Sequence, residues 1–197
     1  RPATFSSQHA KRFVFVNYSK SISPLPMAEV PSTFFLKPGR PAPDFVLPDP
    51  SGRPHALSDL LAGKKGLLVA FVCNHCPFVI HLAEALGTLA QRIASEGINT
   101  VAINANDADR YPGDAPDKME GFAAANGWRF PYLYDETQEV AKAYAAACTP
   151  DFYLFDGEGR LSYAGQFDDS RPGKGEIPSG SDLLSAVEDL LSGKPTP

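Results

Sequence analysis

The residues of this chain best suited to covalent chemistry lie in one short segment, FVCNHCPFV, at positions 71–79. Cys73 and Cys76 are three positions apart, His75 lies between them and Pro77 follows. Two thiols at this spacing can exchange electrons with an outside disulfide, because one thiolate attacks it and the second thiol resolves the mixed disulfide. The same thiols can also bind a metal ion or form a structural disulfide. The position of the pair in the fold helps to decide among these three.

The cysteine pair lies between a predicted strand and a predicted helix. Residues 66–72 (GLLVAFV) are continuously apolar, which indicates a buried central strand. Over residues 79–93, apolar side chains recur every three or four positions, which predicts an amphipathic helix that ends at Gly97. The N-terminus of a helix carries unpaired N–H groups and partial positive charge, and both favour a thiolate. We therefore expect Cys73, ahead of the helix and of His75, to be the attacking and more acidic thiolate.

Strands and helices alternate along the rest of the chain, which predicts an α/β fold. Further strands are expected at residues 98–104, 131–134, 151–155 and 161–167, and further helices at 59–62, 117–126, 136–147 and 182–191. The last two strands form a hairpin, so the sheet is expected to be mixed. Ser58 and Ser181 are the expected N-caps of the first and last of these helices. One domain is expected over residues 29–197.

Composition excludes several classes of function. The chain has 197 residues and a net charge of −5, which argues against nucleic-acid binding, because that needs clustered Lys and Arg. No apolar run approaches the length of a membrane span. Three cysteines are not typical of a small secreted domain held together by disulfide bonds, and a chain of this length can fold without them. A soluble monomer or homodimer without nucleic-acid or membrane partners is expected.

Residues 1–28 differ in composition from the rest of the chain. They contain four basic residues, five serines and no Asp or Glu. A basic, Ser-rich and acid-poor segment is typical of an organellar transit peptide, and the alternative is an upstream extension outside the fold. The expected location is the cytoplasm, or a plastid or other organelle if residues 1–26 are a transit peptide.

The metal interpretation has less support than the redox one. The segment supplies Cys73, His75 and Cys76, and His81 or Cys148 would complete four ligands. Structural zinc sites usually need a second ligand pair at fixed spacing, and the sequence has none. Haem attachment requires CxxCH, whereas Pro77 follows the second cysteine. We expect no metal and no cofactor other than a redox-active disulfide that an external thiol reduces.

The chain resembles the thioredoxin superfamily, in its redoxin or peroxiredoxin-like (AhpC/TSA-type) subgroup with a CNHCP active site. The segments that carry the resemblance lie between residues 37 and 195, and they are PGRPAPDFVLPDPSGRPHALSDL, CNHCPFV, VAINANDADRYPGDAP and ACTPDFYLFDGEGRLSYAGQFDDSRP. The resemblance implies a thioredoxin-like fold, with a central mixed sheet flanked by helices and an N-terminal β extension. It also implies that Thr149–Pro150 is a cis-proline loop facing the cysteine pair, with the Thr149 hydroxyl near a sulfur. Cys148 is then either a third redox thiol or a small buried residue.

Two redox reactions fit this resemblance. Peroxidases of the superfamily carry PxxxTxxC, and neither cysteine is preceded by that proline and threonine. Thiol–disulfide exchange between Cys73 and Cys76 is therefore the expected activity, with a protein disulfide substrate or a thioredoxin- or glutathione-type reductant as partner. A peroxidase with Cys73 as the peroxidatic cysteine is the alternative. A third interpretation is a metal-binding or redox-sensing module without catalysis.

Further polar residues are candidates for tuning the pair. A histidine just before the second cysteine resembles the strongly oxidising CPHC enzymes, in which a stabilised thiolate favours the reduced form. Asn74, where those enzymes have proline, weakens the likeness, but both Asn74 and His75 are expected to set the redox potential. Asn104, Asn106 and Asp107 follow a predicted strand, and they either line a groove or cap their own loop.

Overall fold

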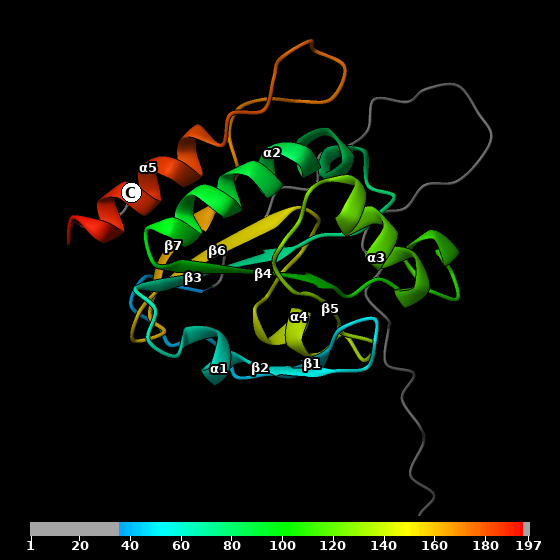
Figure 1. Ribbon diagram of the computed structural model, residues 1–197, viewed down its shortest axis with the longest axis horizontal. Coiled ribbons are helices and arrows are strands. Elements are labelled where there is room, and N and C mark those ends of the chain that lie inside the picture. Colours follow the sequence, from blue (N-terminus) through cyan, green and yellow to red (C-terminus); the bar gives the residue numbers. More distant parts are fainter. Residues whose placement is uncertain (1–35, 195–197) are drawn as a thin grey trace, which may run out of the picture.

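The central sheet has five strands, β3 (Gly66–Phe71), β4 (Ile98–Asn104), β5 (Tyr132–Tyr134), β6 (Asp151–Asp156) and β7 (Leu161–Gly165). Their order is β5-β4-β3-β6-β7 in a computed structural model that describes residues 36–194 (Figure 1). β3 is parallel to β4 and antiparallel to β6, so the predicted mixed sheet is confirmed. The expectations for residues 1–28, and for a domain that begins at residue 29, lie outside the described residues.

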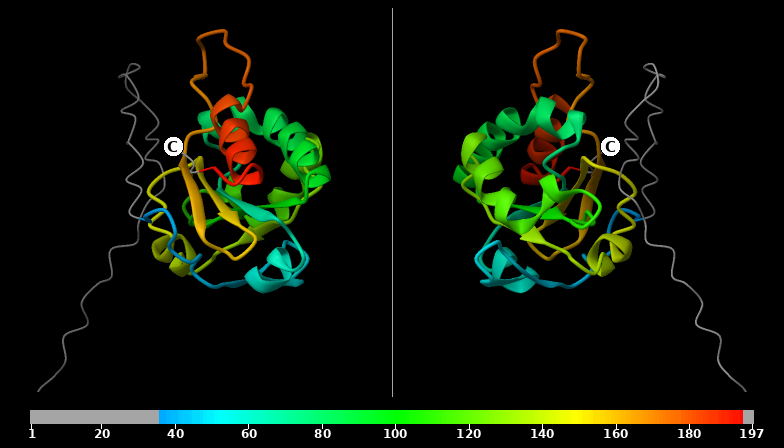
Figure 2. Two further views of the ribbon diagram at one scale, coloured as in Figure 1. Left: turned by 90° about the vertical axis from the view of Figure 1, so that its left-hand side faces the viewer. Right: turned by 90° about the vertical axis from the view of Figure 1, so that its right-hand side faces the viewer.

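Helices cover both faces of the sheet (Figures 1 and 2). One face carries α2 (Pro77–Ser95), α3 (Pro116–Ala125) and α5 (Ser181–Leu191). The other face carries α1 (Leu57–Leu61), α4 (Glu139–Ala143) and an antiparallel pair of short strands, β1 (Val46–Pro48) and β2 (Pro54–Ala56). The β1–β2 pair is the expected N-terminal β extension, and among the described residues no helix has the length and hydrophobicity to span a bilayer.

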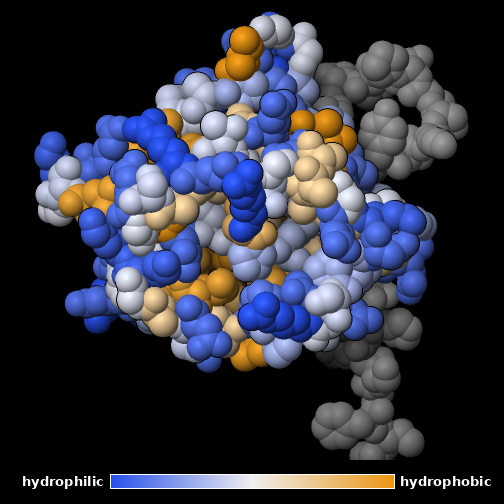
Figure 3. Space-filling model, in the orientation of Figure 1, coloured by the Kyte–Doolittle hydropathy of each residue, from blue (hydrophilic) through white to orange (hydrophobic). Residues whose placement is uncertain are grey.

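The alternation of β3 divides the interior into two cores. Leu68 and Ala70 pack under α2, whereas Leu67, Val69 and Phe71 face the side of α1 and α4. All five are buried, which explains why the strand is apolar at every position. On the face drawn in Figure 3 most of the described surface is hydrophilic, and apolar residues show in separate patches.

Most predicted elements agree with the structure to within two residues at each end. The exception is α4, which is shorter than the predicted 136–147 because Gln138 (φ 62°) and Ala145 (φ 53°) adopt left-handed backbone that an α-helix excludes. The predicted N-caps are wrong. Helix α1 has already begun when the chain reaches Ser58, and Gly180, in left-handed backbone (φ 68°), is the N-cap of α5.

The sheet brings the ends of β3 and β4 to the same edge. After β3 the Val72 N–H donates to the Ile103 carbonyl oxygen (3.0 Å), so the chain leaves the sheet directly beside the end of β4. The carboxyl ends of parallel strands are where α/β sheets usually place their sites. The CNHC segment therefore emerges next to the loop of residues 105–115, which includes a 3₁₀ turn, η1 (Pro112–Asp114).

Candidate active site

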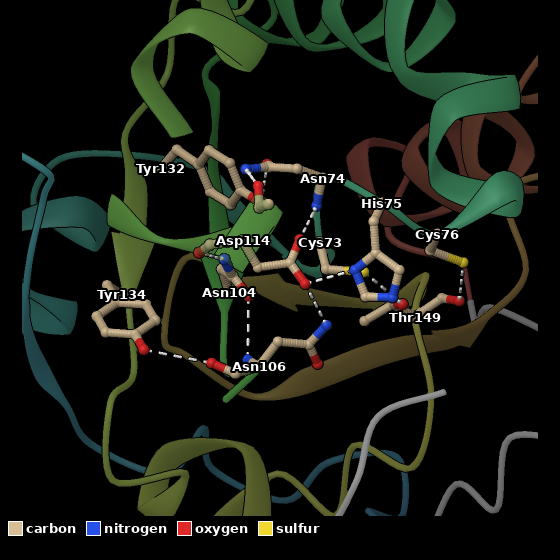
Figure 4. Close-up of polar contacts among 11 residues, drawn as sticks. Cys73, Asn74, His75, Cys76, Asn104, Asn106, Asp114, Tyr132, Tyr134 and Thr149 are labelled. Carbon is tan, nitrogen blue, oxygen red and sulfur yellow. Dashed lines mark hydrogen bonds and ion pairs between the residues drawn. The ribbon is translucent and has the colours of Figure 1, made fainter. Parts of the chain in front are cut away.

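The two cysteines lie at the junction of β3 and α2, as predicted, and both are free thiols. Thr149–Pro150 is a cis peptide bond, and its loop faces the pair, which confirms the expectation from the resemblance (Figure 4). The Thr149 hydroxyl lies 3.3 Å from the Cys73 sulfur, and the Thr149 carbonyl oxygen lies 3.3 Å from the Cys76 sulfur. One residue of the cis-proline loop therefore contacts both sulfurs.

The pKa values of the two thiols are shifted in opposite directions, and which cysteine is the more acidic stays a prediction. The pKa of Cys76 is lowered to about 6, chiefly by the neighbouring Cys73 thiol and also by the N–H groups of Val79 and Phe78, although burial opposes this. The pKa of Cys73 is raised by the neighbouring Cys76 thiol, by burial and by the Asp114 carboxylate. Helix α2 begins after Cys76, so it is this sulfur that lies on the helix N-terminus.

Asp114, which the sequence analysis does not single out, organises the CNHC segment. This residue of η1 is fully buried, with 0% of its surface exposed. Its Oδ1 accepts the Asn74 N–H (2.7 Å), and its Oδ2 accepts from Nδ1 of His75 (2.5 Å) and Nδ2 of Asn106 (2.8 Å). A buried carboxylate is stabilised by such hydrogen bonds. Asp114 thereby ties together the loops that follow β3 and β4 (Figure 4).

His75 is held on two sides. Its Nδ1 pairs with Asp114, and its ring stacks on Tyr111 with the centroids 4.8 Å apart and the planes at 11°. Its pKa is raised, because the Asp114 carboxylate accepts its N–H and attracts its positive charge, although burial opposes this. Nε2 is buried and has no hydrogen-bond partner among the described residues. His75 therefore belongs to the polar network of the site, as expected of a residue that tunes the pair.

The remaining polar residues around the site hold the loops in place. Nδ2 of Asn74 donates to the Gly113 carbonyl oxygen (2.9 Å), and the Tyr132 hydroxyl donates to Oδ1 of Asn74 (3.0 Å). Asn104 donates to the Asp114 carbonyl oxygen (2.8 Å) and accepts the Asn106 N–H (3.0 Å). Both of these asparagines are buried, so they support the loop and do not line an open groove.

Asp107 and Cys148 each make a contact close to their own position in the chain. Asp107 accepts the N–H of Asp109 (3.1 Å), which is the loop-capping alternative. Cys148 is half-buried, and its thiol donates to Oδ1 of Asp151 (3.3 Å) at the start of β6. A redox role for Cys148 stays a prediction.

The side chains that could bind a metal in the structure differ from those considered from the sequence. Cys73, His75 and Asp114 have ligand atoms within 4.8 Å of one another. By contrast, His81 pairs with Ser170 (3.1 Å) and the Cys148 thiol with Asp151. Both Asp114 oxygens already accept hydrogen bonds, one of them from His75. The hydrogen bonds of Asp114 are therefore sufficient to explain why this cluster forms.

A mixed five-stranded sheet, and a cis-proline loop over a cysteine pair at a strand-to-helix junction, define a thioredoxin-like protein with a dithiol site. The chain belongs to the AhpC/TSA family, whose sequence profile matches residues 38–164. The predicted family and fold class are thus confirmed.

Three known proteins illustrate the likeness. The chain is 30% identical over 126 residues to thiol-disulfide oxidoreductase ResA of Geobacillus thermodenitrificans (strain NG80-2), a match that covers 62% of this chain and 66% of ResA, just under two thirds. The crystal structure of hypothetical protein SMc02350 from Sinorhizobium meliloti 1021 superposes with a TM-score of 0.79 at 48% identity, and covers 82% of this chain and 88% of that one. Peroxidoxin BcpB from Mycobacterium tuberculosis (TM-score 0.60, 20% identity, 80% and 97% covered) shares the fold.

Proposed function

We propose that the protein is a thiol–disulfide oxidoreductase that cycles Cys73 and Cys76 between dithiol and disulfide. The observation that carries the proposal is the geometry of the pair. Two free thiols lie at the start of α2, and the cis-proline loop contacts both sulfurs at 3.3 Å. The pKa values of the two thiols are shifted in opposite directions, so one of them is the readier nucleophile at neutral pH. One ready nucleophile and one adjacent resolving thiol are what disulfide exchange requires. The similarity to the thiol-disulfide oxidoreductase ResA supports the same class.

The exchange reaction follows from these roles. The Cys76 thiolate attacks one sulfur of the substrate disulfide, and the other substrate sulfur leaves as a thiolate. Cys73 then loses its proton and attacks the Cys76 sulfur, which releases the second substrate thiolate and leaves a Cys73–Cys76 disulfide. Two electrons have passed to the substrate, and an external thiol of the thioredoxin or glutathione type restores the dithiol. This order of attack, with Cys76 first, is part of the proposal, whereas the sequence predicts Cys73 in that role.

Thr149 supports this reaction from the cis-proline loop. Its hydroxyl and carbonyl groups each lie 3.3 Å from one sulfur, so the loop fixes both sulfurs relative to each other. Cys76 is only 1% exposed, so a substrate sulfur can reach it only after neighbouring side chains move. A protein disulfide is the substrate class that we propose.

Reduction of insulin disulfides by dithiothreitol tests the proposal. The wild-type protein should accelerate the reaction, and Cys76→Ser and Cys73→Ser should each lose that acceleration. Cys148→Ser is the matched control and should keep the acceleration, because the Cys148 thiol is hydrogen-bonded to Asp151. Unchanged turnover in Cys76→Ser would show that the pair does not carry the activity.

Peroxide reduction is the second candidate, and the family match together with the acidic Cys76 thiolate favours it. The thiolate would attack one peroxide oxygen to form a sulfenic acid and release water or an alcohol. Cys73 would then condense with the sulfenic acid, releasing water and forming the disulfide. Peroxide consumption by the same wild-type and Cys→Ser proteins, with dithiothreitol as reductant, separates this reaction from insulin reduction.

A further inference from the structure

We propose that the side chains of Cys73, His75 and Asp114 form a zinc-binding site in the reduced protein. The proposal goes beyond disulfide exchange, because binding of an ion depends on the positions of these side chains and not on turnover. The sequence alone predicts no metal site, since it shows no second pair of ligands near the cysteines. Asp114 is a ligand that only the fold brings to this segment.

The three side chains are already close enough to share one ion. The Cys73 sulfur, a ring nitrogen of His75 and a carboxylate oxygen of Asp114 lie within 4.8 Å of one another (Figure 4). Zinc binds sulfur at about 2.3 Å and nitrogen or oxygen at about 2.0–2.2 Å, so its ligand atoms lie roughly 3–4 Å apart. Side-chain shifts of about 1 Å would therefore bring all three ligand atoms to bonding distance.

The types of ligand favour zinc over other common cations. A thiolate and an imidazole are ligands of zinc and of other transition metals, whereas calcium and magnesium prefer oxygen ligands. One thiolate and one carboxylate also offset the two positive charges of the ion. Cys73 and Asp114 are both 0% exposed, so this balance avoids an uncompensated charge in the interior.

Hydrogen bonds hold the carboxylate in place before an ion binds. The Asn74 N–H donates to Oδ1 of Asp114 (2.7 Å), and Nδ2 of Asn106 donates to Oδ2 (2.8 Å). A carboxylate accepts at about four lone-pair sites, so both of these bonds can persist beside a bound ion. The ion has to replace only the hydrogen bond from His75. Hydrogen-bonded partners of this kind orient the ligands of known metal sites.

The ring of His75 is oriented but not fully paired. Its stack on Tyr111 fixes the plane of the ring. Nε2 is buried and has no hydrogen-bond partner within residues 36–194. Buried polar atoms are usually paired, so this ring has bonding capacity that the surrounding protein does not use.

Binding is expected only while the cysteine pair is reduced. The thiolate is the form of cysteine that binds a metal, and the Cys73 sulfur no longer supplies it when it is bonded to Cys76. Thr149 contacts both sulfurs at 3.3 Å, so Cys76 is the candidate for the fourth ligand that a tetrahedral site takes. Formation of the disulfide would therefore release the ion.

Zinc titration of the reduced full-length protein tests the proposal. The protein is reduced, separated from the reductant without air and titrated with zinc chloride in competition with a chromogenic chelator. We expect one zinc ion per chain, and an affinity lower by at least about 10-fold in His75→Ala and in Asp114→Asn. The disulfide form should not bind. Cobalt in place of zinc should give a thiolate-to-metal charge-transfer band that weakens in Cys73→Ser.

His81→Ala and Cys148→Ser are the matched controls, because these residues are the further ligands considered from the sequence and they pair with Ser170 and Asp151 instead. Both variants should bind zinc as the wild type does. If the reduced wild-type protein takes no zinc from the chelator, or if His75→Ala and Asp114→Asn keep the wild-type affinity, the proposal is wrong. Circular dichroism establishes that each variant is folded, and His75→Ala decides the question if Asp114→Asn is not. None of these measurements depends on exchange activity, so failure of the proposed function would leave their outcome intact.

Discussion

The acidity of Cys76 has a direct consequence for alkylation. Its pKa of about 6 compares with an ordinary value of 9.0. In a Cys148→Ser background, Cys73→Ser leaves Cys76 as the single thiol, and this thiol should be about 90% ionised at pH 7 and almost fully ionised at pH 9. Its rate with iodoacetamide should therefore rise only about 1.1-fold between these pH values. An ordinary thiol should rise about 50-fold, because its ionised fraction goes from about 1% to about half.

The ratio of the rates at the two pH values is the useful quantity. Burial of Cys76 slows both rates, and the lower intrinsic nucleophilicity of an acidic thiolate reduces both by about 20-fold for three pKa units. Neither effect changes the ratio. Cys76→Ser in the same Cys148→Ser background, which leaves only Cys73, should show a rise that approaches 100-fold, because the pKa of Cys73 lies above 9.0. Denatured protein is the control for an ordinary thiol.

The reasoning is refuted by one pattern of rates. If Cys73→Ser shows the steep rise and Cys76→Ser the flat profile, then Cys73 is the acidic thiol. The Cys73 thiolate would in that case be stabilised by groups other than the N–H groups of Phe78 and Val79. Such a result would also reverse the order of attack in the proposed reaction.

Three further predictions concern oxidation, packing and pH. Mild oxidation with oxidised glutathione should give a Cys73–Cys76 disulfide with Cys148 free, and peptide mapping that finds a dominant bridge to Cys148 would contradict this. Gly87→Ala should lower the free energy of unfolding by about 1–3 kcal/mol, because its Cβ would lie 2.4 Å from the Asn126 carbonyl oxygen. Gly121→Ala on α3 is its control, since the added Cβ meets nothing within 4 Å and should stabilise by about 0.5–1 kcal/mol; equal urea midpoints for the two variants would oppose the argument. The reduced protein should gain stability relative to Cys76→Ser as pH rises from about 6 to 9, because the folded pKa of Cys76 lies below its unfolded value of 9.0 and the folded state then binds fewer protons. His75, with its raised pKa, lowers the stability as pH rises above its unfolded value of 6.5, and it does so in both proteins. The test is therefore the difference between their free energies of unfolding in urea. A difference that is constant with pH would contradict the prediction.

Repeating patterns in the sequence were sufficient to predict the scaffold of the site. The apolar run at β3 and the three-to-four spacing in α2 each reflect burial against the rest of the fold, and β4 begins and ends at the predicted residues. Together they placed the cysteine pair at a strand-to-helix junction. The resemblance added the cis-proline loop, which no local pattern specifies.

Which of the two cysteines lies at the helix N-terminus could not be obtained in this way. Sequence patterns locate a helix start to within a few residues, while Cys73 and Cys76 are separated by less than one helical turn. An error of that size in the helix start changes which sulfur is expected beside the helix N–H groups. In the structure α2 begins at Pro77.

Asp114 was missed for a different reason. It lies in the segment YPGDAP, where proline and glycine indicate only a turn. Its burial arises when the loop after β4 folds onto the loop after β3, and no spacing in the sequence records that contact. A lone acidic residue in a turn is usually exposed, so composition gave no reason to single it out.

The position of Cys76 at the N-cap of α2 gives the molecule an internal reporter of its own redox state. In the reduced protein the N–H groups of Phe78 and Val79, at the start of α2, stabilise negative charge on the Cys76 sulfur. A disulfide sulfur carries no charge and is a weak acceptor, so the same two amides should exchange faster with solvent after oxidation. Their NMR signals would follow electron transfer at the site without any added probe.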